Sequence, residues 1–156
     1  KKLKIDENSI LIIRGCGPVG YPGSAEVVNM QPPDRLLKKG ITHLPTLGDG
    51  RQSGTSESPS ILHVSPESAV GGDLGIVKTG DKMKIDLNKR RVDLLISQSE
   101  FKKRRKNKKL FKANNQTPWQ EIFRNTVGQL EDGACINSRG TYLDVSNKKG
   151  LPRNSH

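Results

Sequence analysis

Aromatic residues, cysteines and long apolar runs are all scarce in this sequence. Aromatic side chains make up 4% of the 156 residues and hydrophobic side chains 31%, so we expect an aliphatic core and many loops. Cys16 and Cys135 are too few for a disulfide framework or for a zinc site, which takes about four ligands. The longest apolar run, Ile10–Ile13, is far shorter than the roughly 18 residues of a membrane span. These absences predict one domain without membrane contact in a reducing compartment.

Positive charge is abundant, with 27 basic against 16 acidic residues and a formal charge of +11. Seven of those basic residues fall within Lys102–Lys109, while the others are dispersed among acids. A tract of this kind is typical of a solvated helix end that runs into a loop. No aromatic side chain interleaves with it to stack on bases, so we do not expect nucleic-acid binding. One alternative stays open: a non-catalytic basic module that uses Lys102–Lys109 to bind a polyanion.

Local patterns predict strands, a hairpin and two helices. Alternating or β-branched runs indicate strands, turn residues separate the halves of the hairpin, and prolines and glycines bound the helices. A Thr-x-x-Gln capping box from Thr117 to Gln120 marks the start of the second helix. The expected elements are a buried strand at 9–14, a loop at 15–23, a short helix at 33–39 capped by Gly40, a strand at 41–47, a hairpin of 82–87 and 91–96, and a helix from Thr117 to near Gly133.

The string Gly15–Gly20 matches G-x-G-x-x-G and follows a predicted strand, as in dinucleotide-binding proteins. That fingerprint needs a helix whose amino terminus holds the pyrophosphate. Pro22 and Gly23 interrupt any such helix within one turn. We therefore reject a dinucleotide site.

A hydrolase triad also has weak support. Ser53 lies in a polar, glycine-rich loop but lacks the G-x-S-x-G elbow of hydrolase nucleophiles. His43 alternates with apolar residues in the strand predicted at 41–47, so we interpret it as structural, and we interpret His63 in the same way.

A further pattern extends over most of the chain. It consists of Arg14–Gly23, Ala25–Val28, Gly48–Ser56, His63–Ala69, Lys78–Asp81, Thr117–Glu121 and Gly128–Ala134. In order and spacing these stretches resemble the family of dihydroxy-acid, phosphogluconate and sugar-acid dehydratases, and the similarity runs from about residue 9 to residue 145. Arg14–Gly17 and Asn29–Pro33 resemble the sugar-acid members, of the arabinonate type, slightly more than the branched-chain ones.

The resemblance implies a fold and a domain organisation. This family has a large amino-terminal domain, which holds an iron-sulfur cluster and part of a magnesium site, and a swivelling β-barrel-like domain that closes over them. The chain resembles that second domain, a mixed α/β unit with peripheral helices. We expect a linker or truncated strand region at 1–8, the domain at 9–146 and a flexible tail at 147–156. No cluster ligand is expected in this chain.

The resemblance also implies roles for individual residues in a hydro-lyase reaction. Glu26 matches the glutamate that binds Mg²⁺, and Ser53 matches the serine that removes the C2 proton of the substrate. Thr55 lies in the same catalytic loop. The residues expected to support the loop and the substrate are Asp49, Gly50, Arg51 and Gly54. Without the iron-sulfur domain we expect the chain to be inactive.

The implied substrates are 2,3-dihydroxy acids or sugar acids, which are dehydrated to 2-keto or 2-keto-3-deoxy acids. The implied partners are the amino-terminal domain and further copies in a homodimer or homotetramer, in the cytoplasm or, in a eukaryote, the mitochondrion. The sequence departs from the family pattern at a few positions. Ser24 stands where methionine is usual, and Glu57 and Asp73 replace glycines. A carboxylate at Glu57 would oppose formation of an alkoxide at Ser53.

Overall fold

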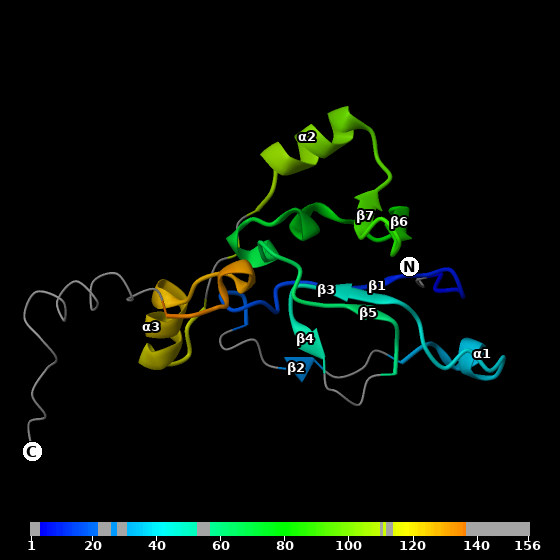
Figure 1. The fold of residues 1–156 in the computed structure, drawn as a ribbon, viewed down its shortest axis with the longest axis horizontal. Helices are drawn as coiled ribbons and strands as arrows, with labels where there is room; N and C mark the ends of the chain where they lie inside the picture. Colours follow the sequence, from blue (N-terminus) through cyan, green and yellow to red (C-terminus); the bar gives the residue numbers. More distant parts are fainter. Residues whose placement is uncertain are drawn as a thin grey trace, which may run out of the picture.

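The computed structural model describes residues 4–21, 26–27, 31–52, 57–109, 111 and 114–136, and Figure 1 shows their arrangement. The strands are β1 (Leu11–Ile13), β2 (Glu26–Val27), β3 (Thr46–Gly48), β4 (Arg51–Gln52), β5 (Ser60–Ile61), β6 (Met83–Asp86) and β7 (Arg91–Leu94). The α-helices are α1 (Asp34–Leu37), α2 (Gln98–Lys106) and α3 (Pro118–Thr126), and the 3₁₀ helices are η1 (Ser68–Val70), η2 (Asp73–Ile76) and η3 (Leu130–Asp132).

A parallel three-stranded sheet lies at the centre, in the order β1-β3-β5. The predicted strand at 9–14 is confirmed as β1, but its side chains are half-buried because it is an edge strand. The strand predicted at 41–47 is mostly wrong, since β3 begins only at Thr46. Two groups explain the late start. The amide of Ile41 donates to Leu36 O at the end of α1, and Pro45 has no amide to donate.

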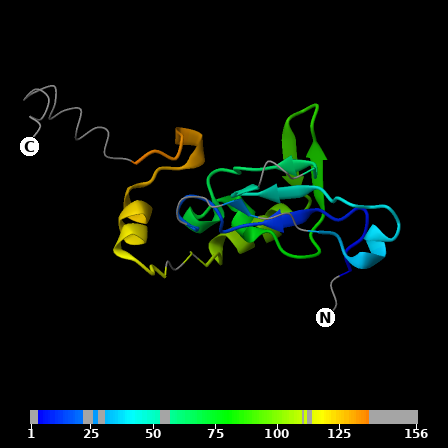
Figure 2. The same cartoon turned by 90° about the horizontal axis from the view of Figure 1, so that it is seen from below.

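The core is aliphatic, as the composition predicts. Leu47 of β3, Leu74 of η2 and Val77 form its buried centre. Half-buried aliphatic side chains and one methionine surround them: Ile10, Ile12, Ile61, Val64, Met83 and Leu94. The last two belong to the β6–β7 hairpin, which is confirmed with antiparallel register from Met83↔Leu94 to Asp86↔Arg91. Figure 2 shows this hairpin projecting from the central sheet.

The two proline-started helices form near their predicted positions, but both are shorter than expected, and α1 ends at Leu37 with Lys38, not Gly40, as its C-cap. Thr117 caps α3, with its Oγ1 accepting from Gln120 N at 3.2 Å. The helix ends at Thr126, and not near Gly133, because Val127 is extended and pairs with Ile136 in an antiparallel bridge. Gly133, at φ +85°, instead caps the separate helix η3. Trp119 in the first turn of α3 is solvent-exposed.

The mixed α/β class is confirmed, whereas the strands of the described ranges form three separate sheets and no closed barrel. The expected tail at 147–156 lies outside the described residues. Across that same described part, no helix has the length and apolar character of a membrane span.

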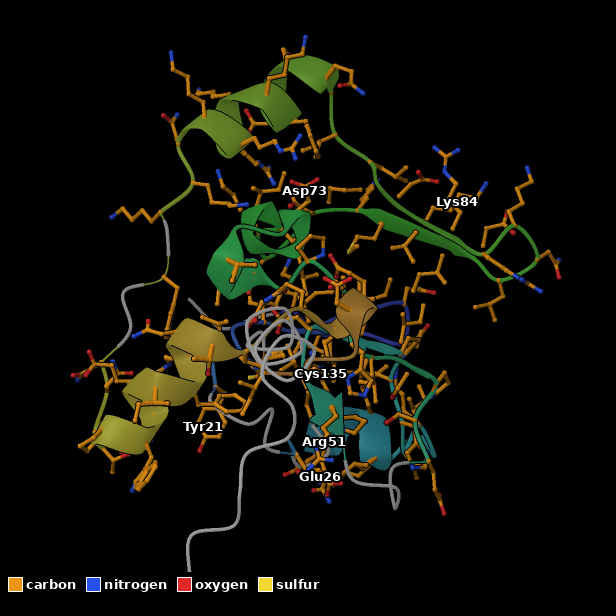
Figure 3. The ribbon with its side chains drawn as sticks, turned by 60° about the vertical axis from the view of Figure 1, so that its left-hand side comes forward. Tyr21, Glu26, Arg51, Asp73, Lys84 and Cys135 are labelled. Atoms are coloured by element: carbon orange, nitrogen blue, oxygen red, sulfur yellow. The ribbon has the colours of Figure 1, made fainter. Side chains whose placement is uncertain are left out.

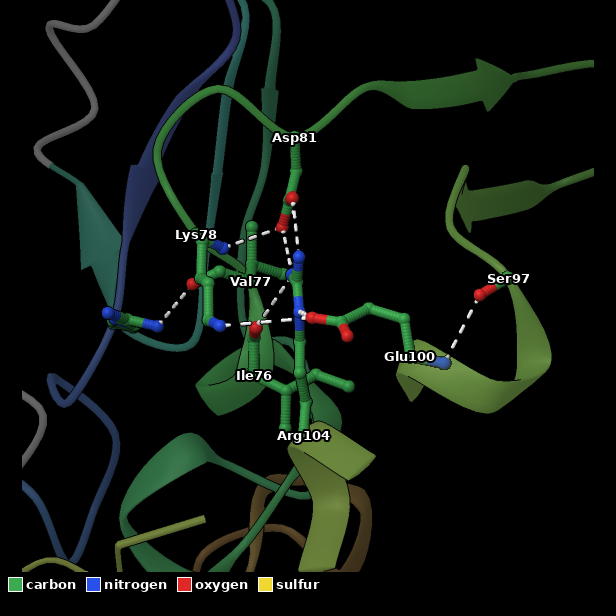
Figure 4. Close-up of polar contacts among 8 residues, drawn as sticks. Ile76, Val77, Lys78, Asp81, Ser97, Glu100 and Arg104 are labelled. Atoms are coloured by element: carbon green, nitrogen blue, oxygen red, sulfur yellow. Dashed lines mark hydrogen bonds and ion pairs between the residues drawn. The ribbon is translucent and has the colours of Figure 1, made fainter. Parts of the chain in front are cut away.

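The basic tract forms the last turns of α2 and the segment after it, as predicted, but one of its cations is not solvated. Arg104 is only 11% exposed and holds Asp81 in two contacts, Nη1 to Oδ2 at 2.5 Å and Nη2 to Oδ1 at 3.0 Å (Figure 4). Its Nε also donates to Glu100 Oε1 at 2.7 Å. These hydrogen bonds to Arg104 lower the pKa of Asp81 and of Glu100 below their ordinary values. The network fixes α2 over the segment that follows η2.

We predict that Arg104→Met lowers the free energy of unfolding, because it leaves the largely buried carboxylate of Asp81 without its cationic partner. A lowered pKa means that this stabilisation is complete above the ordinary pKa of 3.8 and is lost as the pH falls through the lower folded value. Urea denaturation at pH 7 and near pH 2.5 measures both effects, and the gap between wild type and variant should narrow at the lower pH.

The matched control is Arg105→Met on the same helix, which breaks the more exposed Arg105–Asp73 pair at 3.1 Å and should change stability little. Equal losses in the two variants at pH 7 would contradict the role assigned to Arg104.

Candidate active site

A glycine-rich loop, residues 15–21, is fastened to the rest of the fold by two fully buried carboxylates. The first is Asp49, directly after β3, at 0% exposure. Its Oδ2 accepts from Gly15 N at 3.0 Å and from Ser68 N at 2.8 Å, and its Oδ1 accepts from Cys16 N at 3.0 Å. The hydroxyl of Ser68 donates to Oδ2 at 2.5 Å. Asp49 therefore holds the loop at 15–21 against β3 and η1.

The second carboxylate is Glu67, also at 0% exposure. Its Oε1 accepts from Val19 N at 2.8 Å and from Gln129 Nε2 at 2.9 Å, while its Oε2 accepts from Gly20 N at 2.9 Å. The amide of Glu67 in turn donates to Gln129 Oε1 at 2.9 Å. Sequence reasoning placed Glu67 in a matching stretch but gave it no role. No local sequence signal identifies this role, because its partners lie 47 to 62 positions away in the chain.

The carboxyl-terminal segment is attached to the same loop. Arg124 of α3 donates from Nε to Val19 O at 2.8 Å and from Nη2 to Gly20 O at 3.3 Å. This arginine connects residues more than 100 positions apart in the chain, and Gln129 connects to Glu67 over 62 positions. The loop thus depends on contacts from both halves of the sequence.

Two glycines of the motif region are required by close packing. A Cβ on Gly17 would lie 2.6 Å from Cβ of Glu67, and a Cβ on Gly50 would lie 2.7 Å from Cβ of Cys16. Residues 15–21 form turns, and no helix begins among them. This segment therefore offers no helix amino terminus to a pyrophosphate, and Gly17 instead leaves room for the buried Glu67.

Glu26 and Arg51 lie side by side on a second, two-stranded parallel sheet. Strand β2 pairs with β4 in the register Glu26↔Arg51 and Val27↔Gln52. Both Glu26 and Arg51 are exposed, and Figure 3 shows them together at one end of the molecule. Ser53 is bonded directly to Gln52, the last residue of β4. The predicted catalytic residues Ser53 and Thr55, and the supporting Gly54, lie outside the described residues.

Glu26 offers one hard oxygen ligand. Among the described residues, its carboxylate makes no hydrogen bond or ion pair, and no group of three or more His, Cys, Asp or Glu side chains gathers around a metal position. Magnesium is commonly held by only one or two protein carboxylates and otherwise by water and substrate. A single exposed carboxylate therefore fits a share in a magnesium site whose other ligands come from elsewhere.

The structure also shows the surroundings of His43, Glu57, Cys16 and Cys135. His43 is exposed in the loop before β3, which corrects its predicted place in a strand, and its Nε2 lies 3.4 Å from Glu57 Oε2. Glu57 thus has a cationic partner when His43 is protonated. Cys16 and Cys135 are free, and burial together with the charge of Asp49 raises the pKa of the Cys16 thiol. A thiol that resists ionisation is a poor cluster ligand.

Comparison with known proteins identifies the family. The chain matches the model of the dihydroxy-acid/6-phosphogluconate dehydratase carboxy-terminal domain over residues 1–134 and belongs to this family. It is 54% identical over 154 residues to a D-xylonate dehydratase of Caulobacter vibrioides, an alignment that covers 99% of this chain and 26% of that protein.

Further relatives carry related names. An L-arabinonate dehydratase of Rhizobium leguminosarum bv. trifolii is 50% identical over 102 residues, or 65% of this chain and 18% of that protein. A dihydroxy-acid dehydratase of Thermodesulfovibrio yellowstonii is 40% identical over 134 residues, or 85% of this chain and 24% of that protein. The chain therefore spans about a quarter of the length of these relatives.

We predict that Glu67→Gln destabilises the protein by about 1–3 kcal/mol. The new side-chain NH₂ group would face backbone N–H groups, which are donors themselves, so a buried hydrogen bond is lost. The shape of the side chain is unchanged, so packing is preserved. Urea denaturation measures the loss, and hydrogen exchange of the Val19 and Gly20 amides should accelerate. Glu131→Gln, an exposed change of the same kind in η3, is the control. Equal stability of the two variants would contradict the anchoring role of Glu67.

Proposed function

We propose that this chain is the substrate-capping domain of a dehydratase that converts sugar acids or 2,3-dihydroxy acids to 2-keto acids. The observation that carries the proposal is the parallel pairing of β2 with β4. It brings Glu26 beside the strand that continues directly into the loop of Ser53. A metal ligand and a base must both reach the same small substrate, so they need to lie close together.

Glu26 is proposed as a ligand of Mg²⁺. Its charged, exposed oxygen suits a hard ion, and Arg51 next to it supplies a positive charge on the side where the substrate carboxylate would lie. Bound Mg²⁺ would stabilise the negative charge that develops on the C2 oxygen and carboxylate, and a cluster in an amino-terminal domain would act on the C3 hydroxyl.

Ser53 is proposed as the base that removes the C2 proton. A serine can accept a proton from so weak an acid only when its alkoxide is stabilised, and glycine-flanked backbone with a nearby cation is suited to that task. Gly54 follows Ser53 in the sequence and Arg51 precedes it by two residues. Thr55, in the same loop, is the neighbouring hydroxyl that would orient the substrate. The loop is attached to a rigid base, because Asp49 and Gly50 just before β4 are fully buried.

The complete protein is proposed to contain an amino-terminal iron-sulfur domain and to act as a homodimer or homotetramer in the cytoplasm. The length of the relatives supports the first point, since the chain accounts for 18–26% of each of the three described above. D-xylonate and L-arabinonate in the names of two relatives favour a sugar acid as the substrate.

The non-catalytic alternative is less well supported. In the tract at 102–109, Arg104 is held by two carboxylates, Arg105 pairs with Asp73, and Lys108 donates to the carbonyls of Gly71 and Gly72. A tract with three of its seven cations engaged within the fold is a weak surface for an extended polyanion.

We predict that Glu26→Gln in the complete protein raises the Mg²⁺ concentration needed for half-maximal dehydration by roughly tenfold or more. The neutral amide keeps the shape of the side chain but loses the charge that holds a hard cation. Activity is measured as keto-acid formation from D-xylonate and L-arabinonate over a magnesium titration, and excess Mg²⁺ should restore part of it.

Glu7→Gln, an exposed change before β1, is the matched control and should leave the titration unchanged. If Glu26→Gln shifts neither the magnesium dependence nor the rate, Glu26 is not a metal ligand.

A further inference from the structure

A second concave site lies away from Glu26. A cavity of about 640 Å³ is bounded by α2, the residues after it, and the segment 75–78. This volume falls in the range of roughly 300–1,000 Å³ typical of small-molecule sites. In Figure 3, Glu26 and Arg51 lie at one end of the molecule while Asp73 and α2 lie toward the other. The cavity is therefore separate from the proposed active site.

The lining of this cavity is strongly cationic. It includes six basic side chains and one acidic side chain: Arg14, Lys78, Lys103, Arg104, Lys108, Lys109 and Glu100. Glu100 is already held by Arg104 at 2.7 Å, and Asp81 behind it is held by the same arginine. These two acids therefore neutralise Arg104 and reduce the field of the remaining cations only in part.

Several of the cations keep donors for a ligand. Within the described part of the chain, Lys103 and Lys109 make no side-chain hydrogen bond or ion pair, and Lys78 has only the contact to Glu100 at 3.9 Å. Arg14 uses Nη1 to donate to Gly75 O and Val77 O, which fixes its side chain while Nε and Nη2 donate to no described residue. A fixed guanidinium with ammonium donors beside it suits the oxygens of a phosphate group.

The negative end of α2 opposes an anion here, but it is the smaller effect. A helix carries about half a negative charge at its carboxyl terminus. Lys103, Lys109, Lys78 and Arg14 bring four positive charges to the same cavity. Lys108, which donates to the carbonyls of Gly71 and Gly72, further offsets backbone negative charge beside the cavity. The net field therefore favours an anion.

We propose that this cavity binds a small phosphate-bearing anion, such as a diphosphate or a phosphorylated metabolite. Concavity favours a compact ligand over an extended polyanion, which would need a continuous charged face. The site is distinct from Glu26 and Arg51, because none of its lining residues belongs to β2 or β4, and it touches the Asp49 network only through Gly15 and Ser68.

The test is calorimetric titration of the full-length protein with inorganic pyrophosphate, in buffer free of divalent cations and at constant ionic strength. We expect saturable binding at one site per chain, weakened about fivefold or more by Lys103→Met. Lys84→Met, an exposed change on the hairpin, is the control and should not alter the affinity. Equal affinity of the two variants, or no saturable binding to wild type, overturns the proposal.

Acetylation of lysines in the wild-type protein gives a readout that does not depend on a variant. Pyrophosphate should slow the modification of Lys103 and Lys78 and leave Lys84 unaffected. Uniform protection of all lysines, or stronger protection by heparin than by pyrophosphate at equal charge, would identify unspecific or extended polyanion binding and contradict a compact site.

Discussion

The structure depends on two carboxylates that are removed from water and satisfied by backbone amides. Asp49 and Glu67 are both fully buried, and between them they accept four amide hydrogens from the loop at 15–21. An ionised carboxylate is costly to bury unless charge-assisted hydrogen bonds replace its hydration. Because these donors belong to one short loop, the loop can adopt only the conformation that supplies them. Gly17 leaves room for Glu67 to approach the loop, and the hydrogen bonds to the two carboxylates hold the loop in this conformation.

The same two carboxylates also hold the start of β4 and the segment that contains Arg124 and Gln129. Asp49 directly precedes Gly50 and β4, so the strand that leads to Ser53 starts from a fixed point. Glu67 and Arg124 attach the carboxyl-terminal segment to the same loop. Glu26 and Arg51 are polar and exposed, and such groups need a rigid support to hold their geometry. In this chain the support is a polar network, whereas the aliphatic core is built around Leu47, Leu74 and Val77 and packs against Met83 and Leu94 of the hairpin.

Local signals predicted part of this fold correctly. The hairpin was predicted from two runs of alternating apolar and polar residues on either side of a turn. The start of α3 was predicted from Thr117 and the proline after it. Features set by backbone pairing outside each local pattern were not predictable. The end of α3 depends on the bridge between Val127 and Ile136, and the short β3 depends on an amide used by α1.

The same distinction holds for the site. Family resemblance pointed to Glu26 and Asp49, whereas the role of Glu67 appears only once its partners 47, 48 and 62 positions away are seen. Arg104 lies within a basic tract that its composition predicts to be solvated, so the burial of this one side chain could not be predicted from the tract. Its burial requires Asp81, which is 23 residues upstream in the sequence.

The central claim is that the loop following β4 supplies the base of a dehydratase. Its most direct test is exchange of the substrate C2 proton with deuterated water, catalysed by the complete protein carrying Ser53→Ala. General-base catalysis contributes roughly 100- to 10,000-fold, so exchange should fall by a factor in this range while substrate and Mg²⁺ still bind. Ser60→Ala, in the following strand, should exchange at the wild-type rate. Exchange at the wild-type rate in Ser53→Ala would contradict the account and turn attention to Thr55.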